Sequence, residues 1–337
     1  MLTLAKIAKE IGVCKSTVSL VLNGRAKEMR ISDETVRKVQ EYCEKVNYLP
    51  SIHARRMRQD IVRNLMVFFN VSDPTSPEST FADYNTDLIL GGITEVADRE
   101  GFSTTIRLYR PGMDARLIFD CFRNRAIDGL IYYGMDMPER WREMFVREKR
   151  RVVGIGIEPG MIPSVNIDNY GISKELTGRL LAQGRRKFLF LSGTEVSYPG
   201  QERERGFLDA LHEAGVAFDA ETGCRRCFFE EEPAYRFVRG LDRAAMPEAF
   251  VCANDKMALG VLRALHEAGV SVPGETAVAG GDNINLAAYV TPGLTTFENR
   301  PAEQGAAACR MLLSMIGGER QGETVTLPSA LALRESA

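Results

Sequence analysis

Long apolar segments are missing from this 337-residue sequence, in which no run of eighteen or more apolar residues occurs. A membrane-spanning helix, and with it a membrane partner, is therefore not expected. The first residues, MLTLAKIAKE, lack the apolar stretch and the cleavage site of a signal peptide. The seven cysteines are an odd number scattered along the chain, which favours a reducing compartment over a set of disulfide bridges. These absences predict a cytoplasmic protein.

Groups that bind metals or catalyse reactions are also scarce. The chain has three histidines, and two of them, His212 and His266, lie near the ends of expected helices with no cluster of ligands beside them. Cys224 and Cys227 form a single CxxC motif without the second pair that a zinc site needs, so we expect two loop thiols. No glycine pattern of a nucleotide-binding loop is complete. The sequence predicts no metal, no cofactor and no enzymatic activity.

Apolar residues make up 45% of the chain, which together with its length suggests two domains with real cores. Charge is divided unevenly between them. Residues 1–60 contain 12 basic and 7 acidic residues, whereas the rest of the chain contains 31 and 38. A basic head before an acidic body favours an anionic partner for the head, and an ordinary solvated surface is the alternative.

The head is expected to be three short helices around one small core. Thr3 can cap the first helix, Gly12 ends it, and Ser32 can cap the third. The second helix, over residues 15–23, buries its valines and leaves four side chains pointing outward: Lys15, Ser16, Ser19 and Leu20. The glycine turn between the first two helices is typical of a helix-turn-helix, with a generic three-helix bundle as the alternative.

The segment after the head, LPSIHARRMRQD at residues 49–60, contains three arginines and the apolar side chain of Met57. A helix of so few residues is not stable alone, because nucleation is costly. This segment therefore needs a surface on which to fold.

From residue 64 onward, apolar runs typical of strands alternate with amphipathic helices. A first set of runs covers residues 65–69, 104–108, 129–133 and 152–157, and a second set covers 187–192, 249–253, 276–280 and a return through 295–297. This alternation predicts an α/β body of two doubly wound lobes, each with a parallel sheet, whose ligands bind at the carboxyl ends of the strands.

Taken together, the chain resembles the LacI/GalR family of bacterial repressors. The resemblance rests on TLAKIAKEIGVCKSTVSLVLNG, on the segment after NYLP, and on VNIDN, CANDKMALG, AGGDN, PGLTTF and LPSALALRES. It implies an all-α helix-turn-helix DNA-binding domain at residues 1–48, a hinge helix at 49–60, and a periplasmic-binding-protein-like domain at 61–337 that binds the effector and dimerises. The first lobe of that domain would cover about 61–168 and 298–326, and the second about 169–297 and 327–337.

The resemblance also implies partners. These are palindromic operator DNA, a second copy of the chain, with a tetramer left open, and a small carbohydrate or sugar-phosphate effector. The loop NGRAKEMRIS resembles the fructose-repressor branch, which hints at a sugar phosphate, although that loop belongs to the head. Closing of the lobes on the effector would move the hinge helices and so control release from DNA, and the sequence leaves the sign of this coupling open.

In such repressors the second helix enters the major groove. Base contacts are then expected from Lys15, Ser16 and Ser19, with Leu20 against a thymine methyl group. The residues implied as phosphate contacts are Thr3, Thr17, Asn23, Ser32 and Tyr48. The sequence departs from the family pattern at Cys14, which replaces a serine cap and would lose an oxygen for the first amide hydrogens, and at Leu20, where many relatives have arginine.

The hinge residues have implied roles in the minor groove. Met57 would wedge into the central base step, Ala54 would let two hinge helices approach each other, and Arg55 and Arg58 would line the groove. A place for Met57 in the core of the neighbouring domain is the alternative.

For the effector, Arg203 matches the arginine of the family, whose guanidinium fork engages hydroxyls or a phosphate. Asn254, Asp282 and Asn299 each follow a predicted strand, and Glu158 is a weaker fifth candidate. Their convergence between the lobes would suit a polyhydroxylated ligand, with capping as the alternative for Asn254 and Asp282. The aromatic wall of the site is expected from Phe81 or Tyr84, in the segment SDPTSPESTFADYN.

The rival function is a sugar-binding carrier or a sugar-acting enzyme built on the same two lobes. A carrier would need an export signal and would have no use for the first 60 residues. An enzyme would need a nucleophile with a base, or a metal. We therefore interpret the sequence as that of a DNA-binding transcriptional regulator, most simply a repressor.

Overall fold

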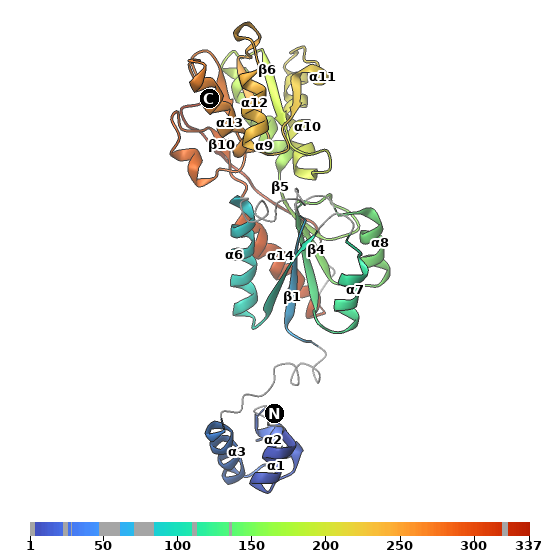
Figure 1. Ribbon diagram of the computed structural model, residues 1–337. Helices are drawn as coiled ribbons and strands as arrows, with labels where there is room; N and C mark the ends of the chain where they lie inside the picture. The colour runs from blue at the N-terminus through green and yellow to red at the C-terminus, as the bar shows by residue number, and fades with distance from the viewer. Residues whose placement is uncertain are drawn as a thin grey trace. The chain divides into compact units, whose positions relative to one another are not determined.

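The structure is a computed structural model that describes residues 4–22, 26–27, 29–46, 61–70, 84–109, 113–134, 137–318 and 323–337. The chain divides into two compact units, Met1–Arg63 and Asn64–Ala337, which we call the head and the body (Figure 1). Among the helices that the structure describes, none is both long and apolar enough to cross a membrane.

The described part of the head contains three helices, α1 (Leu4–Ile11), α2 (Lys15–Leu22) and α3 (Asp33–Lys45). Between α1 and α2, Gly12 has a φ of +75°, a left-handed conformation that glycine adopts without a steric penalty. Ser32 caps α3 by accepting a hydrogen bond from the Thr35 N–H. The three helices share one small core of Ile7, Ala8, Val18, Val21, Ala26, Val39 and Cys43. The expected three-helix head is confirmed.

Six parallel strands form the sheet of the first lobe, in the spatial order β11-β5-β4-β3-β1-β2. Their bounds are β1 (Asn64–Asn70), β2 (Ser103–Tyr109), β3 (Gly129–Gly134), β4 (Val152–Ile155), β5 (Ser164–Ile167) and β11 (Val325–Leu327). The strand β1 pairs with β2 on one side and β3 on the other, so Val67 lies between Ile106 and Ile131. The first of the two predicted parallel sheets is therefore present.

Successive side chains of β1 point to opposite faces of this sheet. Leu65, Val67 and Phe69 pack with α6 and α14, whereas Met66 and Phe68 pack with α7 and α8. Figure 1 shows the two helix pairs on either side of the sheet. The bounds are α6 (Tyr84–Arg99), α7 (Arg116–Arg123), α8 (Glu139–Arg147) and α14 (Pro301–Ile316). Burial of both faces explains why β1 is a continuous apolar run.

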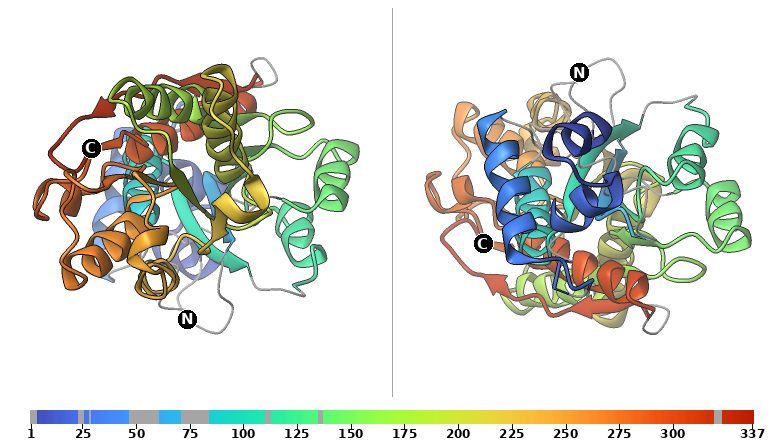
Figure 2. Two further views of the ribbon diagram at one scale, coloured as in Figure 1. Left: turned by 90° about the horizontal axis from the view of Figure 1, so that it is seen from above. Right: turned by 90° about the horizontal axis from the view of Figure 1, so that it is seen from below.

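Four parallel strands form the sheet of the second lobe, in the order β7-β6-β8-β9. Their bounds are β6 (Phe188–Ser192), β7 (Cys224–Arg226), β8 (Ala249–Cys252) and β9 (Ala277–Ala279). The neighbouring helices are α9 (Asn169–Ala182), α10 (Tyr198–Glu213), α11 (Ala220–Gly223), α12 (Glu231–Arg239) and α13 (Asp255–Glu267). Figure 2 shows the pair α9 and α10 on one side of the strands and the pair α12 and α13 on the other.

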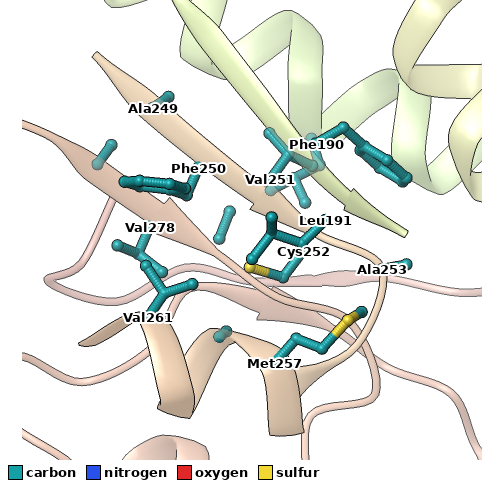
Figure 3. Packing of buried hydrophobic residues seen from close by; sticks show 14 of the residues in the cluster. Phe190, Leu191, Ala249, Phe250, Val251, Cys252, Ala253, Met257, Val261 and Val278 are labelled. Carbon is teal, nitrogen blue, oxygen red and sulfur yellow. The ribbon is translucent and has the colours of Figure 1, made fainter. Parts of the chain in front are cut away.

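The core of the second lobe is continuous through its sheet. Phe190 of β6 stacks on Phe207 of α10, with ring centroids 4.9 Å apart. Phe250 and Cys252 of β8 lie toward α13, near Met257 (Figure 3). This two-sided burial positions the carboxyl ends of β6, β8 and β9 along one edge.

The last residues of the chain pack against the second lobe. After a short turn of 3₁₀-helix, η2 (Asn285–Ala288), the strand β10 (Thr296–Phe297) pairs antiparallel with β12 (Leu331–Ala332). The Ser336 hydroxyl, which is fully buried, donates a hydrogen bond to the Val278 carbonyl of β9. The last residues thereby complete the second lobe.

Four strands of the body, β5, β7, β11 and β12, were not predicted, and one expectation at β7 is wrong. We expected loop thiols at Cys224 and Cys227, but Cys224 begins β7 and Cys227 is 1% exposed in the core. Burial raises the pKa of these thiols to about 12 and about 11, respectively. The strand β7 lies at the edge of its sheet and exposes Arg225 and Arg226, so it has no apolar run by which to recognise it. The strand β5 is only four residues long.

Candidate DNA-binding and effector-binding sites

The thiol of Cys14 caps the amino-terminal end of α2. The Thr17 N–H donates a hydrogen bond to Cys14 Sγ at 3.3 Å, and the hydroxyls of Ser16 and Thr17 lie 2.8 and 2.9 Å from the same sulfur. Cys14 was expected to lose the cap that a serine provides, and this expectation is wrong, because sulfur accepts the amide hydrogen in place of oxygen. The hydrogen bonds from Ser16 and Thr17 lower the pKa of the exposed thiol to about 7.

The outward surface of α2 is smaller than predicted. Lys15 and Ser16 are exposed, and Thr17 and Leu20 are half-buried. Ser19, however, is only 6% exposed, so the prediction that it points outward is wrong. It lies about 60° around the helix from Leu22, on the flank of the core stripe, and its short side chain is covered there. Lys15 and Ser16 are therefore the accessible pair on this helix.

Several predicted DNA contacts lie outside the described residues: Thr3, Asn23, Tyr48, Ala54, Arg55, Met57 and Arg58. Phe81, one of the two aromatic candidates for the effector site, also lies outside them. Ser32 is exposed and caps α3, which leaves its predicted phosphate contact a prediction.

In the body, the side chain of Arg203 on α10 is almost completely buried and held by three groups. Its Nε donates to Asn169 Oδ1 at 2.8 Å, and its Nη1 donates to the Ala253 carbonyl at 2.5 Å and to Asp282 Oδ1 at 3.2 Å. The ring of Phe297 packs against the guanidinium, 4.8 Å from centroid to Cζ. These contacts hold the guanidinium plane in one orientation.

Asp282 reaches Arg203 from an uncommon backbone conformation. Its φ is 133°, in the region that residues with a side chain rarely adopt. The Asp282 N–H donates to the Phe297 carbonyl at 2.9 Å, and the Asn299 N–H donates to the Asp282 carbonyl at 3.3 Å. The loop after β9 is thereby tied to the segment that follows β10, which places Asp282 and Asn299 side by side.

Asn254 follows β8 and caps α13. Its Oδ1 accepts from the Met257 N–H at 3.0 Å, and its Nδ2 donates to the Phe229 carbonyl at 3.0 Å. The capping alternative therefore describes this residue, because both ends of its amide are occupied by the protein. In the same way, Asn299 Oδ1 accepts from Gln304 Nε2 at 3.3 Å.

The structure thus brings Arg203, Asn254, Asp282 and Asn299 together at the carboxyl ends of the second-lobe strands. Glu158 is in a different setting. It is exposed, follows β4 of the first lobe, and forms an ion pair with Arg142 of α8 at 3.3 Å. Glu158 still lies near the second lobe, because its charge contributes to raising the pKa of Tyr198 on α10, after burial and Glu202.

Comparison with known proteins covers both units of the chain. Residues 3–51 match the model of bacterial regulatory proteins of the lacI family, and residues 177–337 match the periplasmic binding protein-like domain. The probable HTH-type transcriptional repressor ExuR of Bacillus subtilis (strain 168) is 26% identical, over 100% of this chain and 98% of that protein. The repressor PurR of Mannheimia succiniciproducens is 27% identical over the same shares. The chain therefore has a head that matches the lacI family and a body that matches the periplasmic binding protein-like domain, and it is similar to transcriptional repressors over its whole length.

Solved structures agree with this two-part architecture. The Lac repressor dimer bound to operator and the anti-inducer ONPF has a TM-score of 0.85 at 22% identity, covering 99% of this chain and 98% of that one. The complex of the regulator CelR with cellobiose has a TM-score of 0.75 at 24% identity, covering 100% of both chains. At these identities the likeness establishes the architecture, a helix-turn-helix head and a two-lobed α/β body. The likeness of the head loop to fructose repressors stays a prediction.

One buried carboxylate, that of Asp255, is not among the site residues expected from the sequence. Asp255 is fully buried, and its two oxygens accept from the Thr296 hydroxyl at 2.5 Å and the Ile284 N–H at 2.9 Å. Burial raises its pKa to about 6, against the hydrogen bonds from Thr296 and Ile284 and the charge of Arg203. Asp255 therefore fixes the loop that contains Asp282.

An aromatic residue beside Asn254 was also missed. The ring of Phe229 lies so close to the backbone of Gly193 that a Cβ there would be 1.9 Å from its Cζ. Phe229 follows the polar edge strand β7, and nothing in its local sequence distinguishes it from a loop residue. Tyr84, the other aromatic candidate, begins α6 and is 39% exposed.

Proposed function

We propose that this protein represses transcription in the cytoplasm by binding palindromic operator DNA, and that a small sugar-like effector bound at Arg203 controls it. The observation on which the proposal rests is the buried Arg203–Asp282 pair at the strand ends of a body that is joined to a helix-turn-helix head. The complex of the relative CelR with cellobiose supports a sugar as the class of effector.

The chemistry around Arg203 favours hydroxyl groups. Its Nε and Nη1 are engaged, whereas its Nη2 has no hydrogen bond to any residue that the structure describes. Phe297 and Asn169 already hold this guanidinium in place. Its Nη2 hydrogens can therefore bind a ligand oxygen with little loss of side-chain entropy. A sugar hydroxyl can accept from Arg203 and donate to a carboxylate such as Asp282.

For DNA, we propose that Lys15 and Ser16 contact base edges. A lysine ammonium can reach the acceptor-rich edge of guanine, and both side chains are exposed at the start of α2. The cap by Cys14 orients the first turn of this helix, from which both residues project.

The proposal includes a homodimer, because a two-fold symmetric operator requires a two-fold symmetric protein. The body supports it with large apolar side chains that are exposed in a single chain. Tyr289, at the end of η2, is 84% exposed, and Leu286 in η2 is 43% exposed. Leu88 on α6 of the first lobe is 49% exposed. Burial of such residues between two bodies would stabilise the pair.

The effector proposal is tested by a thermal-shift screen of monosaccharides and sugar phosphates against the wild type and Arg203→Lys. Lysine keeps the positive charge beside Asp282 but cannot reproduce the fork. A sugar that raises the melting temperature of the wild type and leaves that of Arg203→Lys unchanged is the expected result. A sugar that stabilises both proteins equally would place the effector elsewhere.

The DNA proposal is tested with an operator selected from random duplexes. We expect binding that weakens steeply between about 50 and 200 mM salt and that changes when the effector is added. A protein that selects no sequence, or whose binding does not depend on salt, would contradict the proposal.

A further inference from the structure

The second lobe has another cavity, on the flank of α10. It has a volume of about 370 Å³ and lies between the carboxyl end of β6, one face of α10 and the end of β7. The residues important here are Ser192 and Thr194 after β6, Glu204 on α10, and Arg226 at the end of β7. The volume is in the range of sites that hold small molecules.

This cavity is separate from the proposed effector site, although both use α10. Arg203 and Glu204 are consecutive, and consecutive side chains of a helix diverge by about 100°. Arg203 points to Asp282 and Phe297, whereas Glu204 lines the second cavity. A ligand can therefore reach Glu204 without touching Arg203.

Polar groups without partners collect around this cavity. Glu204 is half-buried and forms no hydrogen bond or ion pair with any residue that the structure describes. Burial raises the pKa of Glu204, and the charge of Arg226 only partly opposes this. Thr194 Oγ1 is one of four buried polar side-chain atoms without a partner in the described part of the chain. Such groups destabilise a fold unless something else satisfies them.

The end of β7 supplies a positive charge to the cavity lining. Arg226 attracts Glu204 but is not in ion-pair contact with it. Its guanidinium pairs instead with Glu195 at 3.3 Å, in a bridge whose side chains are 39% and 77% exposed. A bridge so open to water is weak and exchanges easily. The cavity lining therefore offers a carboxylate from α10 and a guanidinium from the end of β7 that form no ion pair with each other.

We propose that this cavity binds a free α-amino acid, whose ammonium group pairs with Glu204 and whose carboxylate pairs with Arg226. The carboxylate of the ligand replaces Glu195 on Arg226, and the ammonium gives Glu204 the partner that the protein lacks. Ser192 and Thr194 line the same cavity. This site is independent of the proposed effector site.

The test is a thermal-shift screen of the twenty common L-amino acids, one at a time, on the full-length wild type, followed by calorimetry of each hit. We expect at least one amino acid to raise the melting temperature. In Glu204→Gln and in Arg226→Gln its affinity should fall about tenfold or more, since each variant removes one charge-assisted contact. Glu195→Gln is the matched control, and there the affinity is retained or increased because Arg226 loses its competing partner.

Derivatives of the hit separate the two contacts. The corresponding amine, which lacks the carboxylate, should bind Arg226→Gln and wild type equally. The N-acetyl derivative, which lacks the ammonium, should bind Glu204→Gln and wild type equally. Glu204→Gln removes an unpartnered charge from a half-buried position, so it should fold, and its melting temperature without ligand is recorded as a check. Arg226, at the surface, provides the second variant.

Three results would overturn the proposal. These are the absence of any stabilising amino acid, undiminished binding to both Glu204→Gln and Arg226→Gln, and loss of binding in Arg203→Lys, which would place the ligand in the effector site. Arg203→Lys is expected to lose binding of the sugar and to keep binding of the amino acid. The effector proposal and the amino-acid proposal can therefore fail independently, and the two failures are distinguishable.

Discussion

The head and the body of this protein build their binding surfaces in opposite ways. In the head, Lys15 and Ser16 are neighbours on α2, and the bonds that order them join residues two or three positions apart. In the body, the partners of Arg203 are Asn169, Ala253 and Asp282, which are 34, 50 and 79 positions away. Substitutions in the local surface should therefore change its chemistry at little cost in stability, whereas substitutions in the surface assembled from distant segments should also destabilise the body.

The largest expected effect is in the body. Asp282→Ala would leave the buried guanidinium of Arg203 without its carboxylate and should lower the free energy of unfolding by about 3 to 5 kcal/mol. Urea denaturation followed by circular dichroism measures this. The double variant with Arg203→Met removes both charges and should recover most of the loss. A loss below about 1 kcal/mol in the single variant would show that Asn169 and Ala253 are sufficient to hold Arg203.

A smaller effect is expected at Asp255 as a function of pH. Its pKa rises from 3.8 to about 6 on folding, so the folded protein keeps a proton that the unfolded chain releases. This contribution to stability is fully present below about pH 4 and is lost as the pH rises through 6, by about 3 kcal/mol in total. Asp255→Asn cannot titrate. The stability of the wild type relative to Asp255→Asn should therefore fall between pH 4 and 7, and a constant difference would contradict the assignment.

In the head, Lys15→Ala should weaken operator binding by about tenfold to a hundredfold, the cost of one base contact, and leave the melting temperature unchanged. Fluorescence anisotropy measures the affinity, and Lys45→Ala, at the exposed end of α3, is the matched control. The comparison of Ser16→Ala with Ser19→Ala sharpens this prediction. Because Ser19 is buried, Ser16→Ala should weaken operator binding more than Ser19→Ala does. A larger loss of affinity in Ser19→Ala would show that Ser19 contacts DNA.

The smallest effect is expected at Cys14. With its pKa near 7, the thiol becomes a thiolate as the pH rises from 6.5 to 8, and a negative charge beside DNA phosphates weakens binding. The operator affinity of the wild type should therefore fall a few-fold more over this range than that of Cys14→Ser, which keeps the cap without titrating. Identical pH profiles for the two proteins would contradict the low pKa.

Some features of the fold were predictable because their signal is local. The apolar runs that became β1, β3, β6 and β8 are buried on both faces and therefore continuous. The repeated ending LHEAG closes both α10 and α13, and Gly215 and Gly269 have φ values of +66° and +63°, as expected for glycines that end helices. The edge strand β7 escaped prediction because half of its surroundings is water, so its residues need not be apolar.

The residues of the candidate sites also differ in whether a local sequence signal or the tertiary structure determines them. The position of Lys15 on an exposed helix follows from helical periodicity, and the left-handed turn at Gly12 follows from the conformational freedom of glycine. The burial of Ser19 depends instead on what covers its flank. Likewise, Arg203 and Asp282 were both named from the sequence, but the choice between ligand binding and capping for Asn254 needed the positions of Phe229 and Met257.

The sequence by itself thus determined the helices of the head, the central strands of both sheets and the polar residues at the ends of those strands, because hydrogen bonding within a helix and burial of an apolar run have signals among near neighbours. The tertiary structure decided which of those residues meet, which charges are buried, and that Glu204 faces a cavity while Arg203 beside it faces Asp282. Burial and charge pairing depend on segments that are distant in sequence and become neighbours only when the sheet forms.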